Sequence, residues 1–430
     1  MTERRVALAT LAVGLLALVV GGVLLVPWDP VPGGRLTPVP VAQVLTPEEV
    51  DRAEAFARWS RLWSWSSLGA SILVACWFGL TDRGRRLVSA LPGRWWVRVP
   101  LAVSALILIG RLVTFPCAVA LRRLRLDEGL THQSWAAFGL DVARTEAVSI
   151  VSTSVVVLVL VGCARRWKRA WPAIAGGVLA VLVVAGSFAY PVIVEPLFTD
   201  VEPLPDGSLR TRILALAEAE GVEVDDVLVA DASRRTTTLN AYVSGFGATR
   251  RVVVYDTLLA EAGRPAARRD DGTLATSGED EVLAVVAHEL AHARHHDVVT
   301  GTVLGAAGVL AGVGLLGLVL AAARRRGAPE PGDPQVVPLV LALAALAMFV
   351  VAPVTNAVSR QLETRADVDA VRASSAVDGG AQAQAAFIGV QRRLAQRSLA
   401  DPTPPALAQL WFASHPGVLT RIAIAQRVAD

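Results

Sequence analysis

Two histidines and a glutamate stand at a spacing that suits metal-dependent hydrolysis. His288, Glu289 and His292 lie in the segment Val285-Val-Ala-His-Glu-Leu-Ala-His292, which has the pattern H-E-x-x-H. Histidines four residues apart lie one turn apart on the same helix face, so both imidazoles can reach one Zn²⁺. Glu289 then faces the open side of the metal, where it can take a proton from water. The segment therefore predicts a zinc metalloprotease with one Zn²⁺ per chain.

A catalytic zinc usually has three protein ligands and one water, so a third ligand must come from elsewhere in the chain. We expect it to be Glu363, in the segment Ser359-Arg-Gln-Leu-Glu-Thr-Arg-Ala-Asp367. Two antiparallel membrane helices joined by a short hairpin separate this segment from the histidines, and such a hairpin returns the chain to its starting point. Asp367 shares the helix face of Glu363, where it can hydrogen-bond a ligand histidine or donate a proton.

The composition is that of a polytopic membrane protein. Hydrophobic residues make up 53% of the chain and charged residues only 18%, and the mean hydropathy is +0.49. A bilayer span takes about 20 helical residues. Seven segments meet or approach that length: Val6–Val26, Leu62–Leu80, Val99–Leu121, Ala147–Cys163, Pro172–Tyr190, Val298–Ala323 and Val336–Pro353. The predicted fold class is a mainly α, multi-pass membrane protein, with Arg111 of the third span facing protein or a wet cavity.

The chain divides into two predicted regions. Residues 1–194 form an N-terminal membrane region of five helices, and residues 195–430 form a metallopeptidase domain that includes the two membrane helices near 298–323 and 336–353. Arginine-rich segments fall on one side of the seven spans, which the positive-inside rule makes cytoplasmic. The metal motif would then face away from the cytoplasm, and we expect the membrane to be the plasma membrane. The arginine-rich segments are Arg4–Arg5, Arg83–Arg86, Arg165–Arg169 and Arg324–Arg326.

The long polar stretch between the fifth and sixth spans predicts a small α/β unit. An amphipathic helical pattern runs through Glu220, and the β-branched runs Val227–Ala230 and Arg251–Tyr255 predict short strands. From Glu279 the pattern is helical, and we expect that helix to carry the metal motif straight toward the sixth span.

Further segments along the chain resemble the type I CAAX prenyl protease family of integral-membrane zinc metalloproteases, which is related to the bacterial heat-shock membrane metalloproteases. The resemblance covers most of the chain from about Arg122 to Arg421. Besides the two motifs above, its elements are Gly129-Leu-Thr-His-Gln133 with Asp141, Tyr190-Pro191, Glu195-Pro-Leu-Phe198, Pro203-Leu-Pro-Asp-Gly207, Asn240-Ala-Tyr242 with Gly245, Tyr255-Asp-Thr-Leu258, and Ser414-His-Pro416 followed by Arg421.

The resemblance implies a gluzincin-type zinc endopeptidase and assigns roles to residues of this chain. It implies that His288, His292 and Glu363 bind Zn²⁺ and that Glu289 is the general base. It further implies that His415 stabilises the oxyanion of the tetrahedral intermediate and that Arg421 supports the site. An imidazole is suited to the first of these roles, because it can donate a hydrogen bond to charge that develops in the transition state. The resemblance also implies that Asn240, Ala241 and Tyr242 bind an extended substrate backbone.

One departure from the family leaves the substrate open. Asp297 stands after the motif at a spacing closer to that of the bacterial heat-shock membrane proteases than to that of the eukaryotic prenyl proteases. The interpretations are therefore C-terminal processing of prenylated peptides, or broad quality-control cleavage of membrane proteins. A third, of another class, is a metalloprotease-like signalling receptor. The expected partners are a peptide or membrane-protein substrate, with or without an attached lipid, and the bilayer; no nucleic acid is expected.

Overall fold

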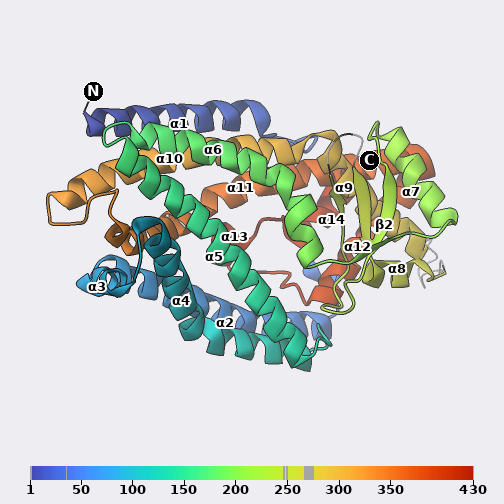
Figure 1. Cartoon of the computed structure of the whole chain (residues 1–430). Coiled ribbons are helices and arrows are strands. Elements are labelled where there is room, and N and C mark those ends of the chain that lie inside the picture. The colour runs from blue at the N-terminus through green and yellow to red at the C-terminus, as the bar shows by residue number, and fades with distance from the viewer. Residues whose placement is uncertain (1, 35, 246, 248–249, 266–275, 430) are drawn as a thin grey trace.

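Seven long apolar helices make up the membrane part of the protein. The computed structural model describes residues 2–34, 36–245, 247, 250–265 and 276–429. Within those residues seven helices are long and apolar enough to cross a membrane, which confirms the predicted number. They are α1 (Glu3–Leu25), α2 (Pro47–Gly79), α4 (Trp95–Asp127), α5 (Trp135–Arg166), α6 (Trp171–Ala189), α10 (Asp297–Arg324) and α11 (Val337–Asp378) (Figure 1).

Several of these helices extend past the segments that hydropathy marks. Helix α2 begins at Pro47, well before the predicted start at Leu62. Hydropathy does not mark this beginning, because the first turns of the helix are polar. A capping box fixes that start: the Thr46 hydroxyl accepts from the Glu49 amide, and the Glu49 carboxylate accepts from the Thr46 amide. Helix α11 likewise has 42 residues, about twice the length a span requires. Its second half therefore continues beyond the apolar stretch and is free to carry polar, functional side chains.

Helices α1 and α10 pack closely because glycines face each other's backbones. A Cβ on Gly14 of α1 would lie 2.3 Å from the Ala311 amide nitrogen, and a Cβ on Gly314 of α10 would lie 2.4 Å from that of Leu11. Small residues at such crossings let membrane helices approach closely and gain van der Waals contact. Elsewhere in the bundle, Arg111 of α4 is paired with Glu146 of α5, so its charge faces protein as the sequence predicts.

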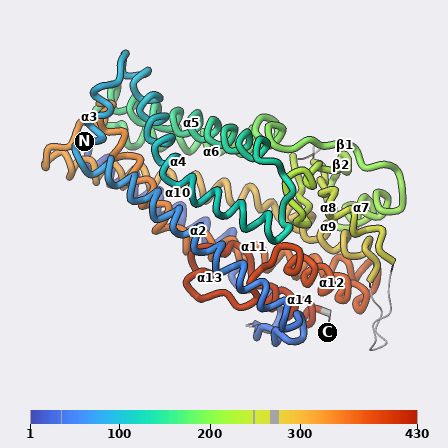
Figure 2. The backbone as a smooth tube through the Cα atoms, turned by 90° about the horizontal axis from the view of Figure 1, so that it is seen from below, coloured from blue at the N-terminus to red at the C-terminus, as the bar shows by residue number. Residues whose placement is uncertain are grey.

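A small four-stranded sheet and its covering helices form a second body at one end of the bundle. Figure 2 shows this body at one end, with the N-terminus and α3 (Asp82–Ala90) at the other. The strand order is β1-β2-β4-β3, with β2 and β4 parallel and both outer pairs antiparallel. Strands β2 and β4 match the two predicted strands, and β3 lies at an edge. The strands are β1 (Val201–Pro203), β2 (Asp226–Ala230), β3 (Ala241–Ser244) and β4 (Arg251–Tyr255).

Helix α9 (Gly278–Arg294) runs through the core of this body and is buried along most of its length. Its apolar side chains pack against the sheet and against α7 (Ser208–Ala219) and α12 (Gly380–Ser398), in one cluster that includes Leu290, Val252 and Phe387. The remaining helical elements are α8 (Asp256–Ala262), α13 (Ala406–Phe412), α14 (Val418–Ala429) and the short turns η1 (Val41–Gln43), η2 (Tyr190–Val194), η3 (Glu195–Leu197) and η5 (Pro334–Val336). The close packing around α9 fixes the helix on which the metal motif lies.

A buried carboxyl beside this core makes the stability of the protein depend on pH. Glu220, at the end of α7, is 6% exposed, and within the described residues neither of its carboxylate oxygens has a hydrogen-bond partner. Burial raises the pKa of Glu220 from 4.5 to about 8, although the charge of Arg294 opposes the shift. Between those two pH values the folded protein holds a proton that the unfolded chain releases. The contribution of Glu220 to the free energy of unfolding therefore falls as the pH rises from about 4.5 to about 8.

We expect Glu220→Gln to remove this pH dependence and to stabilise the protein at pH 8 by on the order of a few kcal/mol, because glutamine carries no charge to bury. Thermal unfolding of the detergent-purified protein between pH 5 and pH 8 measures the effect. Glu218→Gln, on the exposed face of the same helix, is the matched control and should follow the wild type. A Glu220→Gln profile that keeps the wild-type slope would contradict the prediction.

Candidate metal centre and active site

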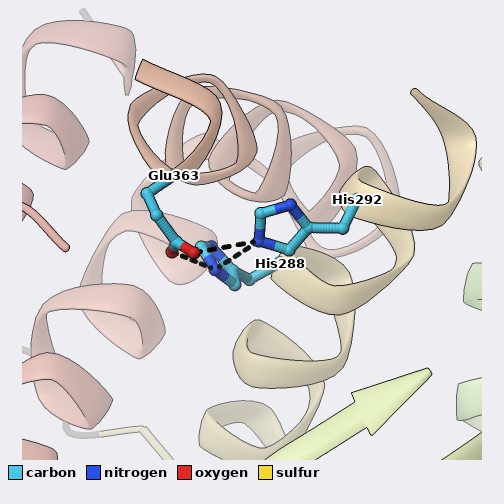
Figure 3. A group of neighbouring side chains, drawn as sticks. All are labelled: His288, His292 and Glu363. Atoms are coloured by element: carbon cyan, nitrogen blue, oxygen red, sulfur yellow. Dashed lines mark hydrogen bonds and ion pairs between the residues drawn. The ribbon is translucent and has the colours of Figure 1, made fainter. Parts of the chain in front are cut away.

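Three side chains from two helices converge on one point. His288 and His292 project from α9 and Glu363 from α11, and one ligand atom from each lies within 4.8 Å of the others (Figure 3). The Nε2 atoms of the two imidazoles are 3.2 Å apart, and Glu363 Oε2 is 3.1 Å from His288 Nε2. The structure therefore brings together the two histidines of the motif and the glutamate predicted as the third ligand. Such a cluster of two imidazoles and a carboxylate is suited to hold a metal ion.

The Nδ1 atoms of both histidines, which are the nitrogens remote from the point of convergence, face carboxylates. His288 Nδ1 is 2.9 Å from Asp367 Oδ1, and Asp367 is fully buried one turn after Glu363 on α11. His292 Nδ1 is 2.8 Å from Asp297 Oδ2, at the start of α10. A carboxylate behind a ligand histidine fixes the tautomer that leaves Nε2 free for a metal, and it orients the ring. Both imidazoles are thus held with Nε2 toward Glu363.

Two arginines neutralise the carboxylates behind the histidines. The guanidinium of Arg421, on α14, donates two hydrogen bonds to Asp367, one of them from Nε at 2.8 Å. Arg365, on α11, donates to the other oxygen of Asp297. Each of these buried carboxylates therefore contacts a positive charge as well as an imidazole.

Proton occupancy of the site follows from these neighbours. Burial lowers the pKa of His292, but its contacts with the carboxylates of Asp297 and Glu363 outweigh that effect and raise the pKa to about 10. Burial also raises the pKa of the Glu289 carboxyl, and the positive charges of His288 and His292 partly offset that rise. Binding a metal must displace any proton on the ligand nitrogens, so acid pH weakens metal binding at this site.

A break after α9 brings Asp297 into place. The motif helix leads toward the sixth span but is not continuous with it, because α9 ends at Arg294 and α10 begins at Asp297. His296 between them has φ +55° and ψ +41°, the left-handed conformation that ends a helix. The chain turns at this residue, and the Asp297 carboxylate returns to His292. A continuous helix would hold positions 292 and 297 about 140° apart around its axis, on different faces.

The remaining predicted site residues lie around the cluster at different distances. His415, between α13 and α14, has Nδ1 2.8 Å from Glu363 Oε2, and 59% of its side chain is exposed. Asn240 is exposed just before β3, while Ala241 is buried and Tyr242 is half-buried within that strand. Strand β3 packs against α9, so the edge strand adjoins the helix that carries the metal motif. Glu289 lies on α9 between the two histidines and is partly exposed.

The sequence did not predict the structural roles of two residues, Asp297 and Glu195. Asp297 stood out only for its spacing, and its contact with His292 depends on the break at His296, which no turn residue marks. Glu195 stood out only as part of a family motif. In the structure its carboxylate accepts hydrogen bonds from the Tyr242 and Ser244 hydroxyls, at 2.7 and 2.8 Å. It thereby fixes β3 against the end of the fifth membrane helix, and no sequence spacing indicates a contact across 47 residues.

The fold and the cluster together define a multi-pass membrane metallopeptidase. The model of a family described as Peptidase family M48 matches residues 203–429, more than half of the chain, so this chain belongs to peptidase family M48. That match contains every member of the cluster and the carboxylates behind it.

Individual relatives agree with this family. The chain is 29% identical to the protein described as "Uncharacterized metalloprotease YhfN" of Bacillus subtilis (strain 168), across 79% of this chain and 75% of that protein. It is 40% identical to a CAAX prenyl protease 1 homolog of Arabidopsis thaliana, but across only 24% of this chain and 21% of that protein. The crystal structure of S. mikatae Ste24p has the same fold: the TM-score is 0.73 at 18% identity, covering 98% of this chain and 99% of that one.

Proposed function

We propose that this protein is a zinc-dependent endopeptidase that cleaves the C-terminal segment of prenylated peptides at the membrane. The observation that carries the proposal is the three-residue cluster of α9 and α11 in a fold that matches Ste24p along almost its whole length. The names of the plant, worm and yeast relatives as CAAX prenyl proteases support the substrate class.

The spacing of the donor atoms supports zinc as the metal. An ion bound tetrahedrally at about 2.0–2.1 Å from nitrogen and oxygen ligands separates those ligands by about 3.3 Å. The separations here are 3.2 Å between the two Nε2 atoms, 3.1 Å from His288 to Glu363, and 3.6 Å from His292 to the other Glu363 oxygen. Two histidines and a glutamate are also the ligand set of one class of catalytic zinc sites.

In this mechanism each side chain handles a proton or a charge. When bound, zinc would polarise the scissile carbonyl and lower the pKa of a water molecule to about 7. Glu289 accepts a proton from the attacking water and returns it to the leaving amine. His415 donates a hydrogen bond to the oxyanion: its Nδ1 faces Glu363, while among the described residues no partner contacts its Nε2.

The edge strand β3 suits the binding of an extended peptide. Its outer edge is unpaired within the described sheet, and a substrate backbone can add there as a further strand. The two hydrogen bonds to Glu195 fix the strand from its side chains, which leaves the backbone groups of that edge for the peptide. We propose that Asn240, Ala241 and Tyr242 supply this binding edge.

A second substrate class has one observation in its favour. Asp297 contacts His292 directly, so its departure from the eukaryotic prenyl proteases concerns the site itself. That spacing favours the alternative of broad quality-control cleavage of membrane proteins. We place the enzyme in the plasma membrane under either alternative.

The test uses detergent-purified protein and two peptides of one sequence ending in C-a-a-X, one farnesylated at the cysteine and one bare. Mass spectrometry maps the cuts, and Glu289→Gln is the negative control. A cut after the modified cysteine that requires the lipid supports prenyl-peptide processing. Equal cleavage of the bare peptide, or cuts elsewhere, supports quality-control proteolysis instead. No cleavage of either peptide, or of a denatured membrane protein, by metal-loaded enzyme would overturn the proposed endopeptidase.

A further inference from the structure

A large cavity lies at the end of the membrane bundle that is remote from the active site. Its volume is about 1100 Å³. It is lined where four membrane helices begin or end: at Glu3 of α1, Arg165 of α5, Trp171 of α6 and Arg324 of α10. Figures 1 and 2 show this end of the bundle on the side of the N-terminus, opposite the sheet and α9. Because the spans end here, the cavity lies at the level where lipid headgroups meet the helices.

The acidic residues of the cavity are already engaged. The Glu3 carboxylate accepts from the indole of the buried Trp171, at 2.9 Å, and from Arg324. Arg324 also donates to Glu330, at 2.7 Å. Asp333 accepts from the Gln335 amide at the start of η5. These contacts form a fixed wall in which the negative charges have internal partners.

Three cations of the same cavity have no such partner. Arg5, Lys168 and Arg169 line the cavity with exposed side chains, and none of these three side chains has a hydrogen bond or ion pair among the described residues. The cavity lining carries five cations and three carboxylates, which leaves a net charge of +2. An anion from outside the chain would find three unpaired cations here, and a phosphate group has the acceptor oxygens to contact several of them.

A second, smaller cavity adjoins this site. Its volume is about 490 Å³, and it shares Arg165 and Asp333 with the first. Trp95 and Trp96 line it, and Arg165 lies over the Trp95 ring, 5.4 Å from its centre. Trp96 is 53% exposed at the start of a membrane helix, where tryptophans favour the boundary between headgroups and acyl chains. An amphipathic ligand suits this pair of cavities better than a free ion, because the second cavity combines two tryptophan rings with the further cations Arg94 and Arg98.

We propose that these joined cavities bind the headgroup of an anionic phospholipid, with its phosphate between Arg5, Lys168 and Arg169 and its glycerol backbone toward Trp95 and Trp96. Basic pockets between membrane helices are suited to such headgroups. The site is separate from the metal centre, so the inference does not depend on the peptidase mechanism or on the substrate class.

The test is native mass spectrometry of the full-length, delipidated protein in detergent, titrated with phosphatidylglycerol or with phosphatidylcholine. The variant is Lys168→Gln combined with Arg169→Gln. Each cation near a membrane surface contributes about fivefold to the binding of an anionic lipid, so the pair should weaken phosphatidylglycerol binding by roughly 25-fold. Phosphatidylcholine should bind the wild type and the variant equally and weakly.

Arg83→Gln combined with Arg86→Gln is the matched control, because it removes two cations from α3 at the same end of the bundle but outside both cavities. It should keep phosphatidylglycerol affinity within about threefold of the wild type. An equal loss in the control would overturn the proposal in favour of diffuse surface charge. Binding of phosphatidylcholine by the wild type as tightly as phosphatidylglycerol would also overturn the proposal. Full displacement of phosphatidylglycerol by millimolar inorganic phosphate would reassign the cavity to a free anion.

Discussion

Glu289→Gln should reduce kcat/KM for peptide cleavage by about a thousandfold while metal content stays at the wild-type level. Glutamine has the shape of glutamate but cannot take a proton from water, and a positioned general base contributes roughly 10²–10⁴-fold to the rate. Glu289 is not one of the three converging donors, so its replacement leaves the metal ligands in place. Cleavage rates and elemental analysis of the same preparation measure the two quantities together.

The matched control for this variant is Glu279→Gln, in the first turn of the same helix. Glu279 contacts Ser208 and Arg212, away from the cluster, so its replacement should leave both activity and metal unchanged. Activity of Glu289→Gln within tenfold of the wild type, with metal bound, would remove Glu289 from the role of base. Loss of the metal together with the activity would instead make Glu289 a ligand.

The parts of this protein that local pattern determines could be predicted from the sequence. The membrane spans follow from apolar length alone, and the placement of His288 and His292 follows from the helical repeat. Glu363 needed one further step, the geometry of a short hairpin between two antiparallel helices. In the structure that geometry holds, with Glu363 Oε2 lying 3.1 Å from His288 Nε2.

The parts that depend on distant contacts or on a single backbone angle could not be predicted. The break at His296 has no glycine or proline to mark it, because a histidine takes up the left-handed conformation there. Asp297 becomes the partner of His292 only through that break. Glu195 contacts β3 residues that lie 47 and 49 positions further along the chain, and the cationic cavity is lined by the ends of helices more than 150 residues apart. Hydrophobic periodicity carries no information about such pairings, because they are set by packing.

Asp367→Asn should weaken both the metal site and the fold. The Asp367 side chain is fully buried between Nδ1 of His288 and the guanidinium of Arg421. Removing its charge leaves the buried Arg421 without its hydrogen-bonded counter-charge, and such a loss typically costs about 3–5 kcal/mol of stability. It also loosens the orientation of His288, and loss of such a partner usually weakens metal binding by about 10–100-fold. Thermal unfolding after metal removal measures the first effect, and competition with a chromophoric chelator measures the second.

The double variant Asp367→Asn with Arg421→Met separates these two effects. Replacing the arginine removes the unpaired charge, so the stability of the metal-free protein should recover in large part, whereas metal affinity should stay low because His288 still lacks its carboxylate. Asp369→Asn, two residues further along α11, is the matched single control, since Asp369 contacts His295 rather than a metal ligand. Wild-type metal affinity in Asp367→Asn would show that His288 is held by its packing on α9 alone. Recovery of affinity in the double variant would show that the charge of Arg421, and not the orientation of His288, governs the metal site.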